Sequence, residues 1–239
     1  MVPRTIARLT LATLFGHRRG LLLYVLPGVF VALSVLLALT VDDKSGLQAA
    51  LLQQLGLAVI LPLVALVAGT GAIASEIDDG SIVYLLSKPI KRSTIVLTKA
   101  VVAIGVVLLL GALPILLAGI VLDPGDVQTA VAFGIGSLVA GIAYVAIFTA
   151  LSVVSGNAVT VGLIYSLLWE SVMGQYVDGA KVLSVQQWSL ALISKLTDAP
   201  RVESAVELPI ATILLVVVTV GGLTLAVAKL RSLVLSTAE

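Results

Sequence analysis

Residues that could carry out chemistry are scarce in this sequence of 239 residues. It contains no cysteine and a single histidine, His17. A chain without cysteine forms no disulfide and has no thiolate ligand or nucleophile, and one imidazole cannot supply a zinc site or a serine–histidine catalytic pair. The motifs GxxxxGK[ST], HExxH and GxSxG are also absent. We therefore expect no catalytic site, no metal site and no bound cofactor in this chain.

Glu170 is the single acidic residue that falls inside a long apolar run. Because a charge in hydrocarbon is costly, such a residue usually has a function or a partner. Together with Trp169 and Trp188 it forms a candidate gate at the outer membrane face. The alternatives are a contact with a cationic substrate, a carboxylate that reaches water, and a hydrogen bond to the segment that follows. The cost of the charge favours a buried structural role or a gate over direct substrate contact.

A second concentration of polar residues is the stretch EIDDGSIVYLLSKPIKR, residues 76–92. Ser75 and Asp78 have the spacing of a helix N-terminus, and the Asp-Gly pair that follows is typical of a turn. Ser81 can then cap a short helix that Pro89 stops. The pattern predicts two caps, a turn and a short helix between two apolar runs.

The short helix of this stretch reads IVYLL and is apolar on nearly every side. An exposed helix of this composition is unfavourable unless another surface covers it. Two interpretations fit the pattern. The helix inserts into another protein, or it lies on the lipid surface and is anchored there by the basic residues that follow it.

Composition places most of the chain in lipid. Hydrophobic residues make up 59% of the sequence and charged residues 11%, whereas a soluble domain carries about 25% charged residues. Six apolar runs are long enough to be considered as helices that cross about 30 Å of hydrocarbon. They cover residues 20–41, 55–74, 100–122, 130–154, 158–173 and 208–228. We therefore expect an all-α integral membrane protein that forms a single transmembrane domain over residues 1–239.

The basic residues are distributed unequally between the two sides of this arrangement. With the N-terminus inside, ten Lys and Arg residues fall on the inner face and four on the outer face. Cytoplasmic segments are enriched in Lys and Arg, so both termini are expected in the cytoplasm. The abundance of Ala, Val and Gly is typical of GC-rich bacterial genomes, and the expected location is the inner membrane. A net charge of +1 gives no reason to expect a nucleic-acid partner.

Two further segments are expected to be helical at the membrane surfaces. Residues 3–19 predict an imperfect amphipathic helix on the inner face, although a basic anchor in front of the first span is an equal alternative. Its arginines are Arg4, Arg8, Arg18 and Arg19. In the long outer segment 174–207, apolar residues from Val185 to Leu196 recur at helical spacing. This pattern predicts a helix that lies in the outer interface or dips into the membrane.

The stretch at 76–92 resembles the segment after the second span of ABC-2 type transporter permeases. In that family an acidic residue is followed by Gly-Thr or Gly-Ser, then by Leu-Leu-Ser-x-Pro and a basic residue before the third span. The matching residues are Glu76, Gly80, Ser81, Leu85, Leu86, Ser87, Pro89 and Arg92. The sequences LLWES and LSVQQWSLAL, near and after the end of the fifth run, are similar to small bacterial members of the family.

The resemblance implies a permease that pairs with a second permease chain, identical or related, and with two cytosolic ATPase subunits that bind ATP and Mg. It implies that residues 75–92 form a coupling helix docked on an ATPase subunit. It also implies an elbow helix at 3–19 and re-entrant helices within 174–207. The implied coupling residues are Glu76, Asp78, Asp79, Gly80, Ser81, Leu85, Leu86, Pro89 and Arg92.

The expected function is ATP-driven export. Polar side chains are few in the apolar runs, which suits a hydrophobic or amphipathic substrate such as a lipid, a drug or a peptide. A secondary transporter or channel that needs no ATP is the first alternative, and the scarcity of intramembrane charge argues against it. A membrane enzyme or an assembly factor is the second alternative, and the enzyme would need a catalytic cluster of polar residues that the sequence does not contain.

Overall fold

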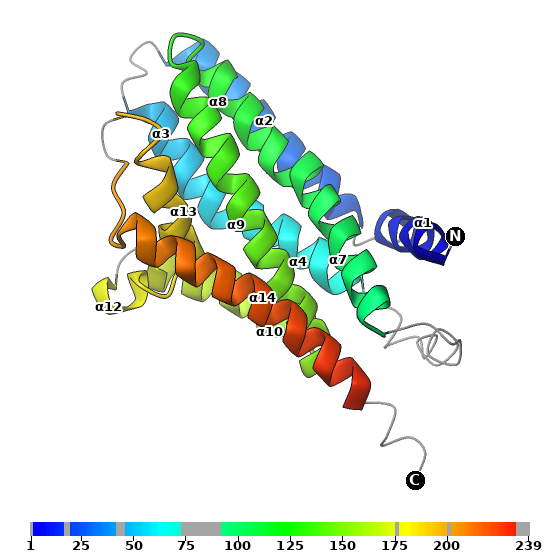
Figure 1. The fold of residues 1–239 in the computed structure, drawn as a ribbon. Coiled ribbons are helices and arrows are strands. Elements are labelled where there is room, and N and C mark those ends of the chain that lie inside the picture. Colours follow the sequence, from blue (N-terminus) through cyan, green and yellow to red (C-terminus); the bar gives the residue numbers. More distant parts are fainter. Residues whose placement is uncertain are drawn as a thin grey trace.

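The computed structural model describes residues 2–16, 20–41, 46–72, 92–174, 177–199 and 202–232 of the chain. Every regular element in these ranges is helical, as the sequence predicts, and the long helices form one bundle (Figure 1). α1 (Val2–Gly16) and the last turn of α14 (Leu208–Ser232) lie at the same end, which we call the terminal end. We call the opposite end, where the turn at 123–126 lies, the distal end (Figure 1).

α1 is an amphipathic helix that leads into the first long helix, α2 (Gly20–Thr40). Ile6, Thr10 and Leu14 recur every fourth residue on one face of α1, and all three are buried. This face packs mainly against the third long helix. The expected amphipathic helix is therefore present over residues 2–16, with its apolar face on the bundle.

The second and third long helices are each interrupted by a π-helical stretch. The second consists of α3 (Leu47–Leu51), η1 (Leu52–Ile60) and α4 (Leu61–Gly71), and the third of α7 (Arg92–Val107), η2 (Leu108–Ala112) and α8 (Leu113–Leu122). Pro62 and Pro114 lie in the first turn of the α-helix that follows each π-helical stretch. A proline has no N–H to donate to the carbonyl of the preceding turn, and its ring crowds that carbonyl. The wider π-helical turn before the proline relieves the crowding, so the helix continues without this hydrogen bond.

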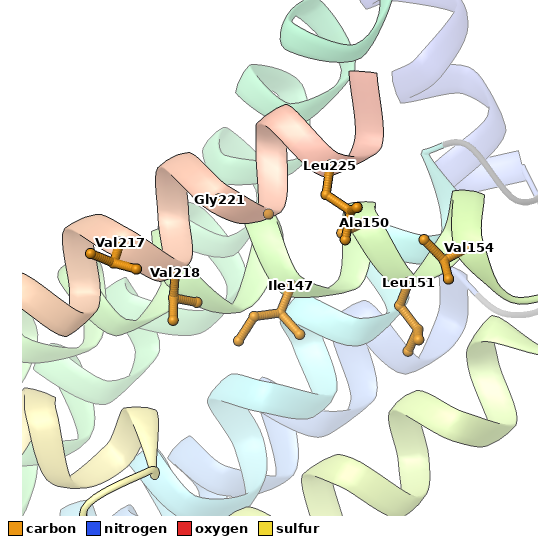
Figure 2. Close-up of a pocket in the computed structure, with 9 residues that line it drawn as sticks. Ile147, Ala150, Leu151, Val154, Val217, Val218, Gly221 and Leu225 are labelled. Carbon is orange, nitrogen blue, oxygen red and sulfur yellow. The ribbon is translucent and has the colours of Figure 1, made fainter. Parts of the chain in front are cut away.

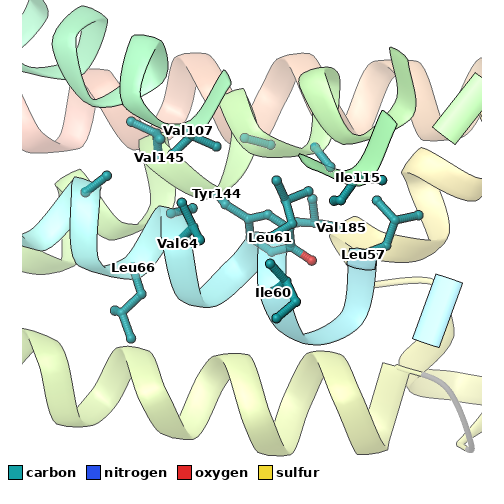
Figure 3. Close-up of a cluster of buried hydrophobic side chains, with 14 of the residues drawn as sticks. Leu57, Ile60, Leu61, Val64, Leu66, Val107, Ile115, Tyr144, Val145 and Val185 are labelled. Atoms are coloured by element: carbon teal, nitrogen blue, oxygen red, sulfur yellow. The ribbon is translucent and has the colours of Figure 1, made fainter. Parts of the chain in front are cut away.

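α9 (Val127–Val154) is the central helix of the bundle, and most of its side chains are buried. It packs against α14 on one side and against α4 and α7 on another. Figure 3 shows the buried apolar cluster between α4, α7 and α9, with Val64, Val107 and Val145 among its members. The cluster fixes the relative positions of the helices that carry the polar sites described below.

Five helical segments in the described ranges are long and apolar enough to cross a membrane. They are Gly20–Thr40, Leu47–Gly71, Ser93–Leu122, Val127–Val154 and Leu208–Leu230. The fifth apolar run of the sequence forms a shorter helix, Ala158–Met173, made of α10 (Ala158–Ile164) and η3 (Tyr165–Met173). The chain is therefore a multi-pass membrane protein.

The second long helix begins nearer the distal end than the predicted start at residue 55. It starts at Leu47, directly after Gly46, whose φ of 75° lies in the left-handed region that favours glycine. The buried amide of Gln48 donates to the carbonyl oxygens of Gly119 and Asp126 at 2.9 and 3.1 Å. Gln48 is polar and lies outside the predicted apolar run. It is nevertheless part of the helix, because its side-chain amide has hydrogen-bond partners inside the bundle.

α13 (Val185–Ile193) lies beside α9 and α14 and packs against both (Figure 1). A single short turn of helix, α12 (Asp178–Lys181), precedes it. The polar side chains of Gln186, Gln187 and Ser189 are buried, like the apolar residues around them. The sequence predicts a helix that lies in the outer interface or dips into the membrane. In the structure, other parts of the chain cover the polar side chains of this helix as well as its apolar ones.

Candidate functional site

Most of the predicted coupling stretch lies outside the described residues. This applies to Glu76, Asp78, Asp79, Gly80, Ser81, Leu85, Leu86, Ser87 and Pro89. Arg92, the last residue of the stretch, is the first residue of α7. The structure does describe how the stretch is anchored, since the chain enters it after Ala72 and leaves it at Arg92.

Lys99 joins the two sides of this anchorage. It lies on α7, about two turns after Arg92, and its ammonium group donates to the carbonyl oxygen of Ala72 at 2.5 Å. Ala72 follows the last turn of α4, where helix carbonyls have no partner within the helix. Lys99 is 1% exposed. The negative end of the α4 dipole and the charge-assisted hydrogen bond offset part of the cost of burying this cation.

α1 packs against the same place. A Cβ atom added to Gly71, the last residue of α4, would lie 2.8 Å from Cδ2 of Leu14. A larger residue at this position would require the Leu14 side chain to shift, so the glycine favours close packing of α1 on the end of α4. The ends of α1, α4 and α7 meet where the chain enters and leaves the coupling stretch.

The basic residues predicted for the elbow helix fall on or beyond α1. Arg4 and Arg8 belong to α1, and Arg8 is exposed. Leu11 and Phe15 are exposed as well, so the outer face of α1 carries apolar residues beside its basic ones. Arg18 and Arg19 lie outside the described residues.

Glu170 forms a second polar site, in the distal half of the bundle. It belongs to η3 and is fully buried. Its Oε1 accepts hydrogen bonds from the Tyr165 hydroxyl at 2.6 Å and the Val185 amide at 3.1 Å. Its Oε2 accepts from the Ser184 hydroxyl at 2.7 Å and the Gln186 amide at 3.2 Å. The carboxylate thus sits at the positive end of α13, where amide groups lack partners within the helix.

The two tryptophans predicted to share a gate with Glu170 contact the segment in front of α13. The indole N–H of Trp188 donates to the carbonyl oxygen of Val182 at 2.7 Å, and Trp188 is 4% exposed. The indole N–H of Trp169 donates to the carbonyl oxygen of Leu183 at 3.4 Å. The structure therefore brings all three predicted gate residues to one place, around residues 182–186. Their role as a gate stays a prediction.

Polar contacts extend from this site to η1 in the second long helix. The Gln186 side-chain amide donates to the carbonyl oxygen of Gln53 at 3.2 Å, and the Ser171 hydroxyl donates to that of Ala58 at 2.8 Å. A backbone carbonyl oxygen has two lone pairs, so it can accept from a side chain in addition to its helical hydrogen bond. Glu170 and its neighbours therefore hold the fifth apolar helix, α13 and η1 together. The sequence suggested a hydrogen bond to the following segment as one alternative, and did not identify η1.

An apolar groove of about 420 Å³ runs between α9 and α14 (Figure 2). Its lining residues are Ile147, Ala150, Leu151, Val154, Val217, Val218, Gly221, Gly222 and Leu225. The groove lies in the half of the bundle toward the terminal end, since it includes the last turn of α9.

Over the described ranges, no group of three or more His, Cys, Asp or Glu residues could hold a metal ion.

The chain matches a known protein family. A family model described as "ABC-2 family transporter protein" matches residues 5–176. The matched range runs from α1 through the predicted coupling stretch to the end of η3. It contains Lys99 and Ala72, and it contains Glu170 but not the donors at residues 184–186. The comparison with curated proteins gives no match.

Proposed function

Because the chain belongs to the ABC-2 transporter family and is the permease of an ABC transporter, we propose that it exports a hydrophobic or amphipathic substrate and is driven by separate ATPase subunits. The observation that carries this proposal is the family match over residues 5–176, which includes most of α1 and the proposed coupling stretch. Membership in this family implies ATPase partners and a location in a membrane. No cofactor is needed in the chain itself, since ATP and Mg bind to the ATPase subunits.

The proposed contact with an ATPase subunit is the stretch at 75–92, with Leu85 and Leu86 as its apolar centre. Movement of this stretch would reach the bundle through Ala72 and Arg92, where it joins α4 and α7. The complete transporter in this proposal contains two ATPase subunits and a second permease chain, identical or related. It lies in the inner membrane of a bacterium with both termini in the cytoplasm, which the ten inner and four outer basic residues support.

The nature of the substrate is proposed from the surfaces that the chain offers within the membrane. The groove between α9 and α14 is lined by apolar residues alone. Fully buried Glu170 accepts four hydrogen bonds from the protein, so it is poorly suited to bind a cationic substrate directly. These features support an apolar or amphipathic substrate, and they support a structural part for Glu170 in the proposed distal gate.

Co-purification with an ATPase subunit tests the coupling assignment. The permease would be expressed with the ATPase encoded next to it and isolated through a tag on the permease. We expect Leu86→Asp and Glu76→Ala to lower the amount of bound ATPase and its stimulation by the permease, because each changes the proposed contact surface. Leu39→Asp, the same kind of change at a residue that is 81% exposed outside the coupling stretch, is the matched control and should bind normally.

Normal binding and stimulation in both coupling variants would contradict the assignment. Transport that proceeds without an ATPase and stops when the proton or sodium gradient is collapsed would favour a secondary transporter instead. The two results differ in kind: the first moves the contact elsewhere on the permease, and the second removes the ATPase from the mechanism.

A further inference from the structure

The position of Lys99 in the bundle is unusual for a lysine. It lies at the start of the third long helix, is 1% exposed, and is surrounded by buried neighbours such as Ile95, Val96 and Ala103. An ammonium group in such surroundings costs free energy unless charge-assisted hydrogen bonds compensate for it. A methionine has nearly the same length and could fill this space without that cost. The lysine therefore provides something that apolar packing does not.

The charged end of Lys99 supplies a connection between two helices that the coupling stretch separates. Its hydrogen bond to Ala72 spans 27 residues of sequence, which include the whole of the coupling stretch. The acceptor belongs to the end of α4 and the donor to α7. Leu14 of α1 packs on Gly71, next to the acceptor. The bond therefore joins the two helix ends between which the coupling stretch lies.

We propose that Lys99 is a positioning residue for energy coupling, because its bond to Ala72 makes the ends of α4 and α7 move as one unit when an ATPase acts on the coupling stretch. This inference rests on the proposed function. Without the bond, a displacement of the stretch could turn the end of either helix separately. With it, the displacement is passed to both helices, and from α4 to α9, against which α4 packs.

The first test measures the connection itself and needs no ATPase. Hydrogen exchange is followed at the amides of residues 68–72 and 96–103 in the purified permease, which can bond within α4 and α7. A hydrogen bond to a charged group contributes about 1.5–3 kcal/mol, so we expect Lys99→Met to lower protection in this region by on the order of tenfold to a hundredfold. Lys99→Arg, which keeps a charged donor, should retain most of the protection. Lys195→Met, at an exposed lysine, is the control.

The second test measures coupling in the complex with the ATPase. The natural chain has no cysteine, so spin labels can be placed on Leu39→Cys and Leu183→Cys, at residues that are 81% and 56% exposed. ATP binding should change the distance between the labels in the wild type and in Lys99→Arg. In Lys99→Met we expect the ATPase to remain bound while the change in distance is lost.

Three results would overturn the proposal. The first is unchanged protection in Lys99→Met. The second is lost protection with a normal response of the labels to ATP, which would leave Lys99 a purely structural role. The third is a failure of both Lys99→Met and Lys99→Gln to accumulate, which would make Lys99 a folding residue. If the wild-type permease binds no ATPase, the proposed function fails, and the hydrogen-exchange result still decides whether Lys99 holds α4 and α7 together.

Discussion

Lys99 and Glu170 are the two charged side chains that lie fully buried in the part of the chain the structure describes. Each meets the end of a helix whose dipole suits its charge. The cation meets the C-terminal end of α4, and the anion meets the N-terminal end of α13. Each charge also joins segments that are distant in sequence. Burial of these charges is therefore tolerated because helix ends supply the partners that lipid cannot.

Glu170→Gln tests the carboxylate at the residue scale. A glutamine keeps one of the two acceptor oxygens. Its NH₂ group replaces the other oxygen and would face the two donors that this oxygen accepts from in the natural protein. Each buried donor left without an acceptor costs about 1–3 kcal/mol. We expect assembly to persist, a lower unfolding temperature in detergent, and reduced transport. Glu207→Gln, at an exposed glutamate, is the matched control. Transport at the wild-type level would remove Glu170 from the proposed gate.

Trp188→Phe tests a neighbouring contact of the same site. Phenylalanine fills most of the space of the indole but cannot donate to the Val182 carbonyl, which now accepts at 2.7 Å. Loss of this partly buried hydrogen bond should lower the free energy of unfolding by about 0.5–1.5 kcal/mol. Thermal unfolding in detergent measures this change. Trp169→Phe removes a longer hydrogen bond, of 3.4 Å, and should cost less. An equal cost for both would contradict the assigned geometry.

At the scale of helices, close contact between α9 and α14 depends on one glycine of a pair. A Cβ atom added at Gly222 would lie 2.8 Å from the backbone carbonyl oxygen of Ala146, whereas a Cβ atom at Gly221 would meet no atom within 4 Å. A backbone oxygen inside a helix cannot move aside as a flexible side chain can. Close packing of α14 on α9 therefore requires a glycine at position 222 but not at position 221.

Alanine at each glycine tests this difference. Gly222→Ala should push α14 away from α9 and destabilise the protein by about 1–3 kcal/mol, the usual cost of overpacking. Gly221→Ala should leave stability unchanged or raise it by up to about 1 kcal/mol, since alanine is the better helix former. Thermal unfolding of the two variants side by side gives the comparison. A destabilised Gly221→Ala together with a normal Gly222→Ala would show that the helices pack on a different register.

Helix number and position follow largely from the apolar runs, because lipid requires uninterrupted helices there. The sequence was less informative where a polar residue has a buried partner far along the chain. Gln48 bonds to residues 119 and 126, and Gln186 to residue 53, so their helices extend through positions that composition assigns to loop or interface. From the sequence, Lys99 is one of the ten basic residues assigned to the inner face. Nothing near it in the sequence marks Ala72 as its partner.

At the scale of the whole molecule, the chain must return from the terminal end to the distal end between α9 and α14. Both helices run toward the terminal end (Figure 1). The connecting helix Ala158–Met173 would be about 24 Å long at 1.5 Å per residue, which is short for about 30 Å of hydrocarbon. Near its end Glu170 bonds to the start of α13. A short helix can therefore complete a crossing, because its last turn ends against protein rather than against lipid.

This argument predicts six crossings, with both termini on one side, and introduced cysteines can test it in a chain that has none. A maleimide that cannot cross membranes should label Pro124→Cys, in the distal turn, in intact cells. Leu9→Cys, in α1, and Ala238→Cys, near the end of the chain, should react only after the membrane is permeabilised. If Ala158–Met173 did not cross, Ala238→Cys would react in intact cells while Leu9→Cys stayed protected. That pattern would leave five crossings and would place the end of α14 on the side opposite α1, against the arrangement in Figure 1.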